Sequence, residues 1–232
     1  MSNYTFPMVV GDYHIKVCVT GPWKENCYLL THRPSCEQVL IDPGDDPGKI
    51  IEMVASEKGT LKYILATHAH VDHIAAVTSV CEEFDQPCWV HIDDKRLFRH
   101  APNYSVGFIG KTIAPPKHAK IYELPADFTL GDQNIEVIHL PGHTGGSVGF
   151  NLGEFIFTGD TLLYENLGRT DLPGADKKQL KNSIERLLSI SGESSLLFSG
   201  HGRPWTLKEA RSWWRMIKES NSLPQYRQIN PD

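Results

Sequence analysis

The sequence predicts an α+β fold in which two mixed β-sheets pack face to face and helices cover their outer faces. Strand patterns and helix patterns are mixed along the chain, and the second half repeats the order of the first in outline. No Pro/Ser-rich linker separates the halves, and 40% of the 232 residues are hydrophobic, which is enough for one sizeable core. We therefore expect a single domain over residues 1–232.

The first half is expected to begin with three strands, because apolar runs alternate with polar residues and turn residues such as Gly21-Pro22 separate them. A helix should follow Asp42-Pro43-Gly44, since Ile50 and Val54 then share one face. The predicted order is strands at 13–20, 26–31 and 38–41, a helix at about 47–58, a strand at 61–66, a helix at 72–84, a strand at 88–92 and a helix at about 93–100.

The second half contains two helix starts with recognisable caps. Asp176 is followed by Gln179, and Thr206 by Glu209; a short polar residue with Glu or Gln at this spacing marks a helix N-terminus. The predicted order is a strand at 134–140, a hairpin of strands at 147–151 and 155–157, a helix at 176–190, a strand at 196–199 and a short C-terminal helix at about 206–220.

Residues 101–120 fit neither the helix period nor the strand period. This stretch combines prolines with Gly107 and Gly110, and it carries the aromatic side chains Tyr104 and Phe108. A long irregular segment within a compact domain is commonly functional. We therefore predict a flap or lid at about 101–120.

The composition restricts the class of partner. The formal charge is −5, and no Lys/Arg run is dense enough to follow a phosphate backbone, which argues against nucleic acid. We find no signal-peptide pattern, no apolar run of about 18 residues, and no Cys-x-x-Cys pair among the five cysteines. The sequence thus predicts a cytoplasmic protein that acts on a small molecule and binds neither nucleic acid nor a membrane.

The chemistry of the chain is concentrated in Thr67-His68-Ala69-His70-Val71-Asp72-His73, which follows the apolar strand predicted at 61–66. The C-terminal ends of such strands are where α/β proteins bind ligands. His68 and His70 are two residues apart, so an extended backbone turns both to one side, whereas Asp72 and His73 lie in the bend. One ion does not easily use all four ligands, but two ions about 3.5–4 Å apart do.

Three further predicted strands end on a residue that can bind a metal. These residues are His143, Asp160 and His201, and each has a neighbouring glycine that permits a tight turn and a close approach of the backbone. Taken singly, each is as easily explained as a turn or surface residue. Together with the first run they supply five imidazoles and two carboxylates, which is enough for two metal sites with water in the remaining positions.

Four motifs resemble those of the metallo-β-lactamase superfamily and, within it, those of short type II glyoxalases (hydroxyacylglutathione hydrolases). They are His68-Ala69-His70-Val71-Asp72-His73, Pro141-Gly142-His143-Thr144, Thr158-Gly159-Asp160-Thr161-Leu162 and Ser199-Gly200-His201-Gly202. The resemblance implies the αββα sandwich of that superfamily over nearly the whole chain.

The resemblance also implies a role for each ligand. The first metal ion would be bound by His68, His70 and His143, the second by Asp72, His73 and His201, and Asp160 would bridge the two. The cofactors would be two divalent ions, with zinc favoured over iron or manganese. A hydroxide shared by the ions would attack the carbonyl of a thioester, which makes Asp72 and Asp160 the expected catalytic carboxylates.

Other activities are compatible with the motifs. The stretch from Gly168 to Gly174 resembles one found both in short glyoxalase-type hydrolases and in persulfide dioxygenases, which would bind a single iron at His68, His143 and Asp160. A lactone or ester hydrolase of the same fold is a further alternative. A metal-stabilised binding module without turnover is the non-enzymatic one.

Substrate recognition is less determined by the sequence than metal binding. Tyr164 is expected either to line the substrate pocket or to pack on the surface, and Arg169 and Asp171 either to contact substrate or to form an ion pair that shapes the loop. Only 31 residues follow His201, too few for the helical domain that supplies much of the glutathione pocket in long glyoxalases, so glutathione specificity is open. The six remaining histidines, including His139, are interpreted as ordinary.

Overall fold

The computed structural model describes residues 6–220, whose strands form two large sheets and one small hairpin. The seven-stranded sheet consists, in spatial order, of β1 (Met8–Val10), β2 (Tyr13–Thr20), β3 (Glu25–His32), β4 (Glu37–Ile41), β5 (Thr60–Leu65), β6 (Cys88–His91) and β7 (Ala119–Tyr122). Its first strands pair antiparallel, whereas β4 to β7 run parallel. This sheet is therefore mixed, as the sequence predicts.

The second sheet has six strands and is also mixed, because β11 and β14 pair in parallel. In spatial order it contains β15 (Trp205–Thr206), β14 (Leu196–Ser199), β11 (Phe155–Gly159), β10 (Val148–Asn151), β9 (Gln133–His139) and β8 (Phe128–Leu130). A hairpin of β12 (Leu162–Leu163) and β13 (Asn166–Leu167) follows β11.

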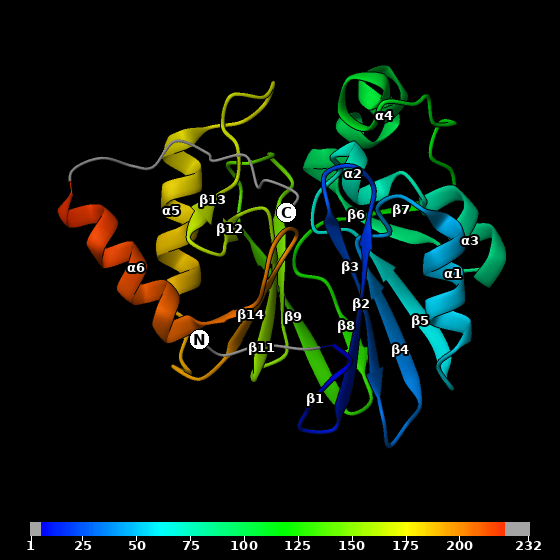
Figure 1. Cartoon of the computed structure of the whole chain (residues 1–232), viewed down its shortest axis with the longest axis horizontal. Helices are drawn as coiled ribbons and strands as arrows, with labels where there is room; N and C mark the ends of the chain where they lie inside the picture. The colour runs from blue at the N-terminus through cyan, green and yellow to red at the C-terminus, as the bar shows by residue number, and fades with distance from the viewer. Residues whose placement is uncertain (1–5, 221–232) are drawn as a thin grey trace.

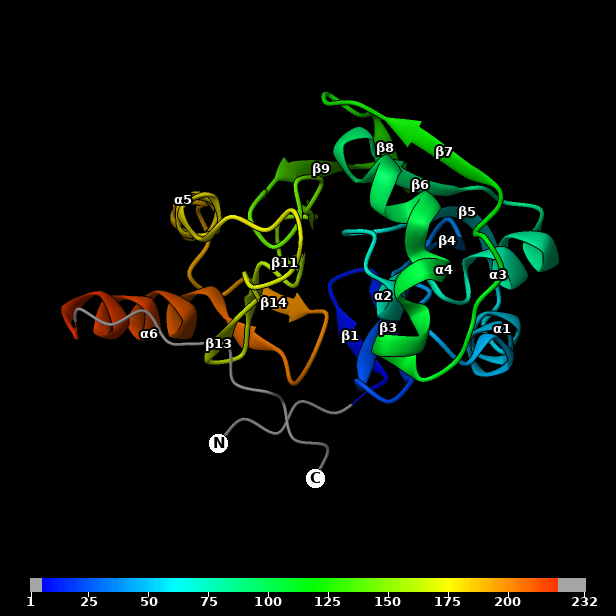
Figure 2. The ribbon, with the colours of Figure 1, turned by 90° about the horizontal axis from the view of Figure 1, so that it is seen from above.

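Helices cover the outer faces of both sheets (Figure 1). The first sheet carries α1 (Pro47–Ala55) and α3 (Val77–Phe84), and the second carries α5 (Lys177–Leu188) and α6 (Leu207–Glu219). Three short or crossing elements lie at the top of the sandwich: α2 (Val71–Ile74), the 3-10 helix Ile92–Asp94 and α4 (Lys95–Ile109), and α4 passes over α2 when the molecule is seen from above (Figure 2). This arrangement confirms the predicted αββα sandwich.

The two sheets are held together by an aromatic core. Leu30 and Val39 from the first sheet pack with Phe150, Phe157 and Phe198 from the second, and all five are at most 1% exposed. Burial of a large apolar side chain contributes roughly 1.5–3 kcal/mol to stability. The core therefore fixes the distance between the two sheets, and with it the distance between the strand ends that carry the candidate ligands.

The caps of the last two helices agree with the sequence prediction. The Asp176 side chain accepts a hydrogen bond from the backbone N–H of Gln179 at the start of α5. Thr206 and Glu209 form a complete capping box at the start of α6. The expected C-terminal helix at about 206–220 is therefore present.

The expected irregular segment at 101–120 is wrong over its first half, because α4 continues to Ile109. The buried side chains Phe98, Ala101, Ser105 and Ile109 follow a helical period and outweigh the proline within the helix. The predicted helix at 72–84 is also divided, into α2 and α3. Between them, the backbone N–H of Ala76 donates to the carbonyl oxygens of Pro43 and Gly44. Six strands of only two to four residues were not predicted from the sequence: β1, β7, β8, β12, β13 and β15.

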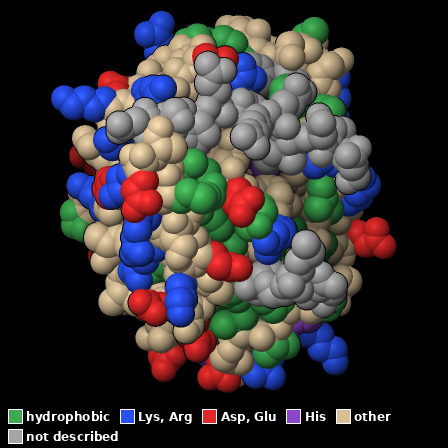
Figure 3. Space-filling view, turned by 60° about the vertical axis from the view of Figure 1, so that its left-hand side comes forward, with side chains coloured by type: hydrophobic (Ala, Val, Ile, Leu, Met, Phe, Trp, Pro, Cys, Tyr) green, Lys and Arg blue, Asp and Glu red, His purple; other side chains and the backbone are tan. Residues whose placement is uncertain are grey.

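The surface carries charges of both signs (Figure 3). On the face that Figure 3 shows, Lys and Arg side chains are interspersed with Asp and Glu side chains. Among the described residues, no helix has both the length and the apolar character that a membrane crossing requires.

Candidate metal centre

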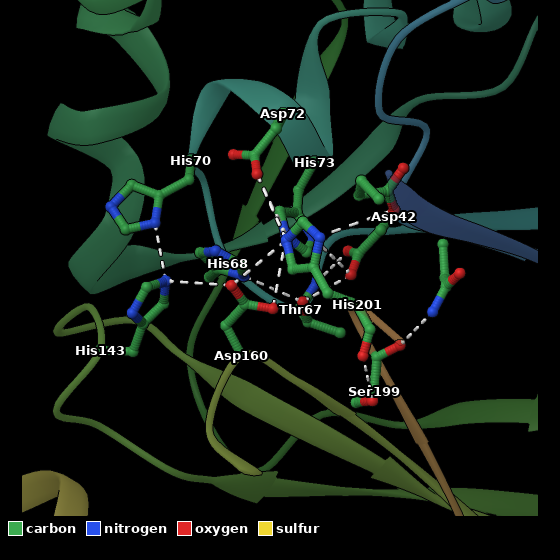
Figure 4. A network of polar contacts seen from close by, with 12 residues as sticks. Asp42, Thr67, His68, His70, Asp72, His73, His143, Asp160, Ser199 and His201 are labelled. Carbon is green, nitrogen blue, oxygen red and sulfur yellow. Dashed lines mark hydrogen bonds and ion pairs between the residues drawn. The ribbon is translucent and has the colours of Figure 1, made fainter. Parts of the chain in front are cut away.

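Four strand ends deliver the candidate ligands to one place between the sheets. The run that follows β5 carries His68 and His70, and its backbone is extended at His70 before α2 begins. Asp160 follows β11 directly, and His201 lies two residues beyond β14. All seven sequence-predicted metal ligands converge there, and none of them is more than about one-eighth exposed (Figure 4): His68, His70, Asp72, His73, His143, Asp160 and His201.

The first predicted triad is formed by His68, His70 and His143, each of which offers a ligand atom within 4.8 Å of the other two. The Nδ1 atom of His70 lies 2.8 Å from Nε2 of His143. The ring of His68 is 4.9 Å from that of His70 and 4.8 Å from that of His143, centroid to centroid. Three imidazoles facing one point are a typical ligand set for a transition metal.

The second predicted triad is formed by Asp72, His73 and His201, whose ligand atoms also lie within 4.8 Å of one another. The Nε2 atom of His201 is 3.4 Å from Oδ2 of Asp72, and Nε2 of His73 is 3.9 Å from the same oxygen. Asp72 and His73 both belong to α2, so a single turn of helix positions two of the three groups.

Asp160 lies between the two triads. Its Oδ2 atom is 3.6 Å from Nε2 of His143 in the first triad and 3.5 Å from Nε2 of His201 in the second. Its Oδ1 atom is 3.6 Å from Nε2 of His73. A carboxylate with one group of ligands on each side is placed to bridge two cations.

The unpaired polar atoms at this place fit a bound cation. His68 Nε2, His73 Nε2 and Asp160 Oδ1 are buried and make no hydrogen bond to the described residues, yet the three side chains form one group with metal-binding spacing. A buried polar atom without a partner costs about 1–3 kcal/mol. Three such atoms aimed at one point are explained when a cation coordinates them.

Gly200 allows these groups to approach so closely. A Cβ atom at this position would collide with Oδ1 of Asp160 and with the ring of His73. The expectation that glycine next to His201 permits close approach of the backbone is therefore confirmed. A larger residue at this position would displace Asp160 or His73.

The two triads differ in their electrostatics. Burial, reinforced by the neighbouring His143, lowers the pKa of His70 to about 3, so its imidazole is neutral. Burial opposes a charge on His73, but the carboxylates of Asp160 and Asp42 outweigh it and raise the pKa to about 10. Burial would likewise favour a neutral Asp72, but the charges of His73 and His201 lower its pKa to about 2.

Asp42 is a supporting residue that the sequence analysis did not identify. Its Oδ2 atom lies 3.0 Å from Nδ1 of His73 and accepts a hydrogen bond from the Thr67 hydroxyl, while Oδ1 accepts one from the Thr67 backbone N–H. The contact holds the His73 ring so that Nε2 faces Asp160. A carboxylate on the outer nitrogen of a metal-binding histidine orients the ring and raises its basicity. The buried carboxylate directly after the strand at 38–41 was a usable signal.

Asp94 is a second supporting residue that sequence reasoning missed. One of its oxygens accepts from the backbone N–H of Ala69 and the Thr144 hydroxyl, and the other accepts from the backbone N–H of Gly146. It therefore ties the backbone between His68 and His70 to the turn that carries His143. No pattern in the sequence marks this contact, because the partners are about 25 and 50 residues away.

Backbone carbonyls orient two more of the histidines. Nδ1 of His143 lies 2.8 Å from the carbonyl oxygen of Arg169, and Nδ1 of His201 lies 3.0 Å from that of Trp23. With a proton on Nδ1, each ring donates to its carbonyl and keeps the lone pair of Nε2 for the centre. The loop containing Arg169 thus shapes the first triad.

The three residues expected near the substrate, Tyr164, Arg169 and Asp171, do not all line the cavity at the centre. Arg169 and Asp171 form a two-bond ion pair with N–O distances of 3.0 and 2.8 Å, and Arg169 also lines the cavity at the centre. Tyr164 does not line that cavity; its ring packs edge-on against Trp205, and the guanidinium of Arg203 lies over it. Tyr164 therefore belongs to the packing of the second sheet.

His139 has a structural role next to the centre. Its ring stacks on that of His91 at 4.7 Å, and its Nε2 atom lies 2.9 Å from the carbonyl oxygen of Gly145 in the His143 turn. His91, Asp93 and His139 also bring one ligand atom each within 4.8 Å of the others. This grouping could not be predicted from the sequence, because His91 and His139 end strands of different sheets.

The chain belongs to the metallo-beta-lactamase superfamily, whose family model matches residues 20–201. This range contains all seven candidate ligands. Similar proteins include a probable metallo-hydrolase of Bacillus subtilis, 33% identical over 78% of this chain and 87% of the relative. A hydroxyacylglutathione hydrolase, GloC, of Haemophilus influenzae is 30% identical over 86% of this chain and 96% of the relative.

Two solved structures extend the comparison. A B3 metallo-beta-lactamase, BLEG-1, is 33% identical and superposes with a TM-score of 0.78 over 85% of this chain and 96% of the other. A protein called TTHA1623 in a di-iron-bound form is 38% identical, with a TM-score of 0.73 over 84% and 96% of the two chains. The protein described here is accordingly a metal-dependent hydrolase of this superfamily.

Proposed function

We propose that the protein hydrolyses a thioester of the hydroxyacylglutathione type at a dinuclear centre, with zinc as the favoured metal and iron or manganese as alternatives. The observation that carries the proposal is the convergence of two triads on Asp160, with three buried polar atoms that make no hydrogen bond to the described residues. The similarity to a hydroxyacylglutathione hydrolase and to a di-iron protein supports it.

The metals and the chain have separate tasks. Two divalent ions supply an ionised water near neutral pH and polarise a carbonyl oxygen. His68, His70 and His143 would hold the first ion, Asp72, His73 and His201 would hold the second, and Asp160 would contact both. Asp72 is ionised at neutral pH because its pKa is about 2. Its negative charge suits it to bind a cation, and it does not act as a proton donor.

The choice of a thioester follows from the leaving group. The cavity at the centre is lined by the ligands together with Trp23, Arg169 and Leu172, and among these residues the acid–base groups are committed to metal binding. A thiol has a pKa near 8.5 and leaves as a thiolate without a proton. An alcohol has a much higher pKa than a thiol, so a thioester needs less help in expelling its leaving group than an ester does. Trp23 and Leu172 supply apolar walls that exclude bulk water from the reaction.

A substrate panel on metal-quantified protein tests the proposal. Wild-type protein is assayed with S-lactoylglutathione, acetyl-coenzyme A, an acyl carrier thioester, a simple lactone and a cephalosporin. His70→Ala removes a ligand, and His118→Ala serves as control because His118 is exposed and pairs with Glu82. The proposal predicts about two metal ions per chain, thioester turnover in wild type and His118→Ala, and a loss of roughly 10³-fold or more in His70→Ala.

Other results would contradict the proposal. One iron per chain with thiol-dependent oxygen uptake would assign a persulfide dioxygenase. Turnover confined to the lactone or the cephalosporin would assign another hydrolase of the fold. Full metal loading without turnover of any substrate would assign a binding module.

A further inference from the structure

A second cavity lies beside the metal centre, under α4. It has a volume of about 580 Å³ and is bounded by α4 on one side and by two loops on the other. We call it the α4 groove and define it by Arg96, His100 and Tyr104 of α4 and by Gly145 and Pro173 opposite them. The position of α4 over α2 places the groove at the same end of the sandwich as the centre (Figures 1 and 2).

The α4 groove is connected to the centre by shared walls. Tyr104 and Pro173 line both the groove and a smaller cavity of about 30 Å³. His70 and Leu172 line both that smaller cavity and the cavity at the centre. The three cavities therefore follow one another, from the candidate ligands to open solvent beside α4.

The connecting cavity is narrow and largely apolar. Its walls include Val71, Leu97 and Leu172, and its volume of about 30 Å³ is far smaller than the 580 Å³ of the groove. An unbranched chain of methylene, amide or thioether groups fits such a passage better than a branched or charged group does. The groove beyond it is much wider and can hold a larger end group.

The lining of the groove carries charges of both signs, with the carboxylates of Asp93 and Asp94 and with Arg96 as its single Arg or Lys side chain. The Arg96 guanidinium is exposed and makes no hydrogen bond or ion pair with any residue in the described part of the chain. The Asp94 carboxylate is buried and is held by hydrogen bonds from Ala69, Thr144 and Gly146, and it forms no ion pair with Arg96. The Asp93 carboxylate faces the His91 and His139 rings at 3.7 and 3.8 Å.

We propose that the α4 groove binds the thiol half of the thioester and that Arg96 pairs with an anionic group at its end. This inference rests on the proposed function. The substrate class is a thioester whose thiol carries a carboxylate or phosphate several bonds from the sulfur, with an unbranched stretch between. A guanidinium binds both kinds of anion with two parallel hydrogen bonds, so the two kinds share one site.

The thiol half is assigned to the groove because of the shape of the passage. The passage admits an unbranched stretch, and the wider groove beyond it admits a larger end group. In the proposed substrate class both belong to the thiol half, so Arg96 acts as a remote anchor for that half. Arg96 is a specificity residue in this account, since it touches the end of the substrate and not the reacting atoms.

Replacement of Arg96 by glutamine tests the assignment by turnover. Arg96→Gln is compared with Arg99→Gln, a matched change on the same helix at an exposed arginine that does not line the groove. The substrates are S-lactoylglutathione, neutral S-lactoyl-N-acetylcysteamine, and S-succinyl-N-acetylcysteamine, in which only the acyl half is charged. A partly exposed ion pair predicts that Arg96→Gln raises KM for S-lactoylglutathione roughly 3- to 10-fold without a change in kcat.

The two N-acetylcysteamine substrates should be unaffected by Arg96→Gln, and Arg99→Gln should change none of the three KM values. An equal KM change for charged and neutral thiols would overturn the proposal. So would a change confined to the succinyl substrate, because the anion would then belong to the acyl half.

A binding measurement reads the groove without turnover. Titration calorimetry of wild type, Arg96→Gln and Arg99→Gln is performed with S-methylglutathione and S-methyl-coenzyme A, which have no thioester to cleave. The proposal predicts that Arg96→Gln weakens at least one of them roughly 3- to 10-fold and that Arg99→Gln weakens neither. Equal affinities in wild type and Arg96→Gln for both ligands would overturn it. If the proposed function fails instead, turnover is absent while the binding difference persists.

Discussion

The two ends of the candidate metal centre use similar side chains but differ in charge. At the histidine end (His68, His70 and His143), burial and neighbouring imidazoles lower the pKa values, so neutral lone pairs are ready for a metal. At the carboxylate end (Asp72, His73 and His201), burial opposes a charge on His73 and His201, but the surrounding carboxylates raise both pKa values. Protons therefore occupy the carboxylate end of the metal-free protein.

Histidine is therefore used in two ways within one metal centre. A cation at the histidine end replaces the hydrogen bond between His70 and His143, displaces no charge from its neutral imidazoles and satisfies the buried Nε2 atom of His68. A cation at the carboxylate end must displace protons, but it also balances the negative charges of Asp42, Asp72 and Asp160. We expect the two ends to respond differently to mutation and to pH.

The largest effect is expected for the residue that both ends share. Asp160→Asn removes the charge that offsets repulsion between two cations, so we expect metal content to fall at both ends and activity to drop roughly 10³-fold or more. Elemental analysis and thioester assays measure both. Asp171→Asn is the control, because this carboxylate is exposed and pairs with Arg169. Retention of two ions per chain in Asp160→Asn would contradict a bridging role.

Removal of one histidine at each end should separate the two sites. His143→Ala is expected to lose the metal of the histidine end, and His201→Ala that of the carboxylate end, so each variant retains about one ion. Both variants should lose most activity, since the attacking water needs both ions. Titration of the metal-free variants with cobalt, monitored by absorption spectroscopy, identifies which site remains. Identical spectra for the two variants would show that the ends are not distinct.

Asp42→Asn is expected to weaken only the carboxylate end. The His73 ring would keep its position but lose the carboxylate on its outer nitrogen, which typically costs 10- to 100-fold in metal affinity. Competition with a chelator measures the affinity of each ion. Asp46→Asn is the control, because Asp46 pairs with Lys49 on the surface. A loss shared equally by both ions would assign Asp42 to general folding.

The smallest predicted effect concerns the stability of the metal-free protein. The pKa of His70 is about 3 against an ordinary 6.5, so the unfolded state binds more protons below pH 6.5 and stability falls as the pH drops towards 3. The pKa of His73 is about 10, so its contribution is complete below pH 6.5 and is lost as the pH rises towards 10. Urea unfolding should therefore show a maximum near pH 6.5.

Excess divalent metal should shift that maximum upward, because cations replace the protons of the carboxylate end. A metal-free protein whose stability rises steadily from pH 6.5 to 9 would contradict the assigned charge of His73. A metal-free protein equally stable at pH 4 and 6.5 would contradict the assigned neutrality of the histidine end.

The sequence allowed a prediction of the sandwich and of the ligand convergence for a physical reason. The ligands follow apolar strands, three of them (His143, Asp160 and His201) sit beside a glycine, and such strand ends meet at one edge. These features are local in sequence, so they can be read without coordinates. The helical spacing of Phe98, Ala101 and Ile109 was equally local, but the nearby proline and glycines hid it.

The supporting contacts could not be predicted in the same way. Asp94 joins Ala69 to Gly146, and the carbonyl of Trp23 orients His201 across 178 residues of chain. Such contacts depend on how the two sheets pack, which the hydrophobic periodicity of a single strand or helix does not reveal. The α4 groove is also formed by segments far apart in sequence, so its lining residues could not be predicted from the sequence.

Anomalous diffraction at the metal absorption edge, from crystals grown with zinc, tests the central claim most directly. The account predicts two peaks per chain about 3.5–4 Å apart, one among His68, His70 and His143 and one among Asp72, His73 and His201, with Asp160 in contact with both. A single peak at full metal loading, or two peaks that do not share Asp160, would contradict it.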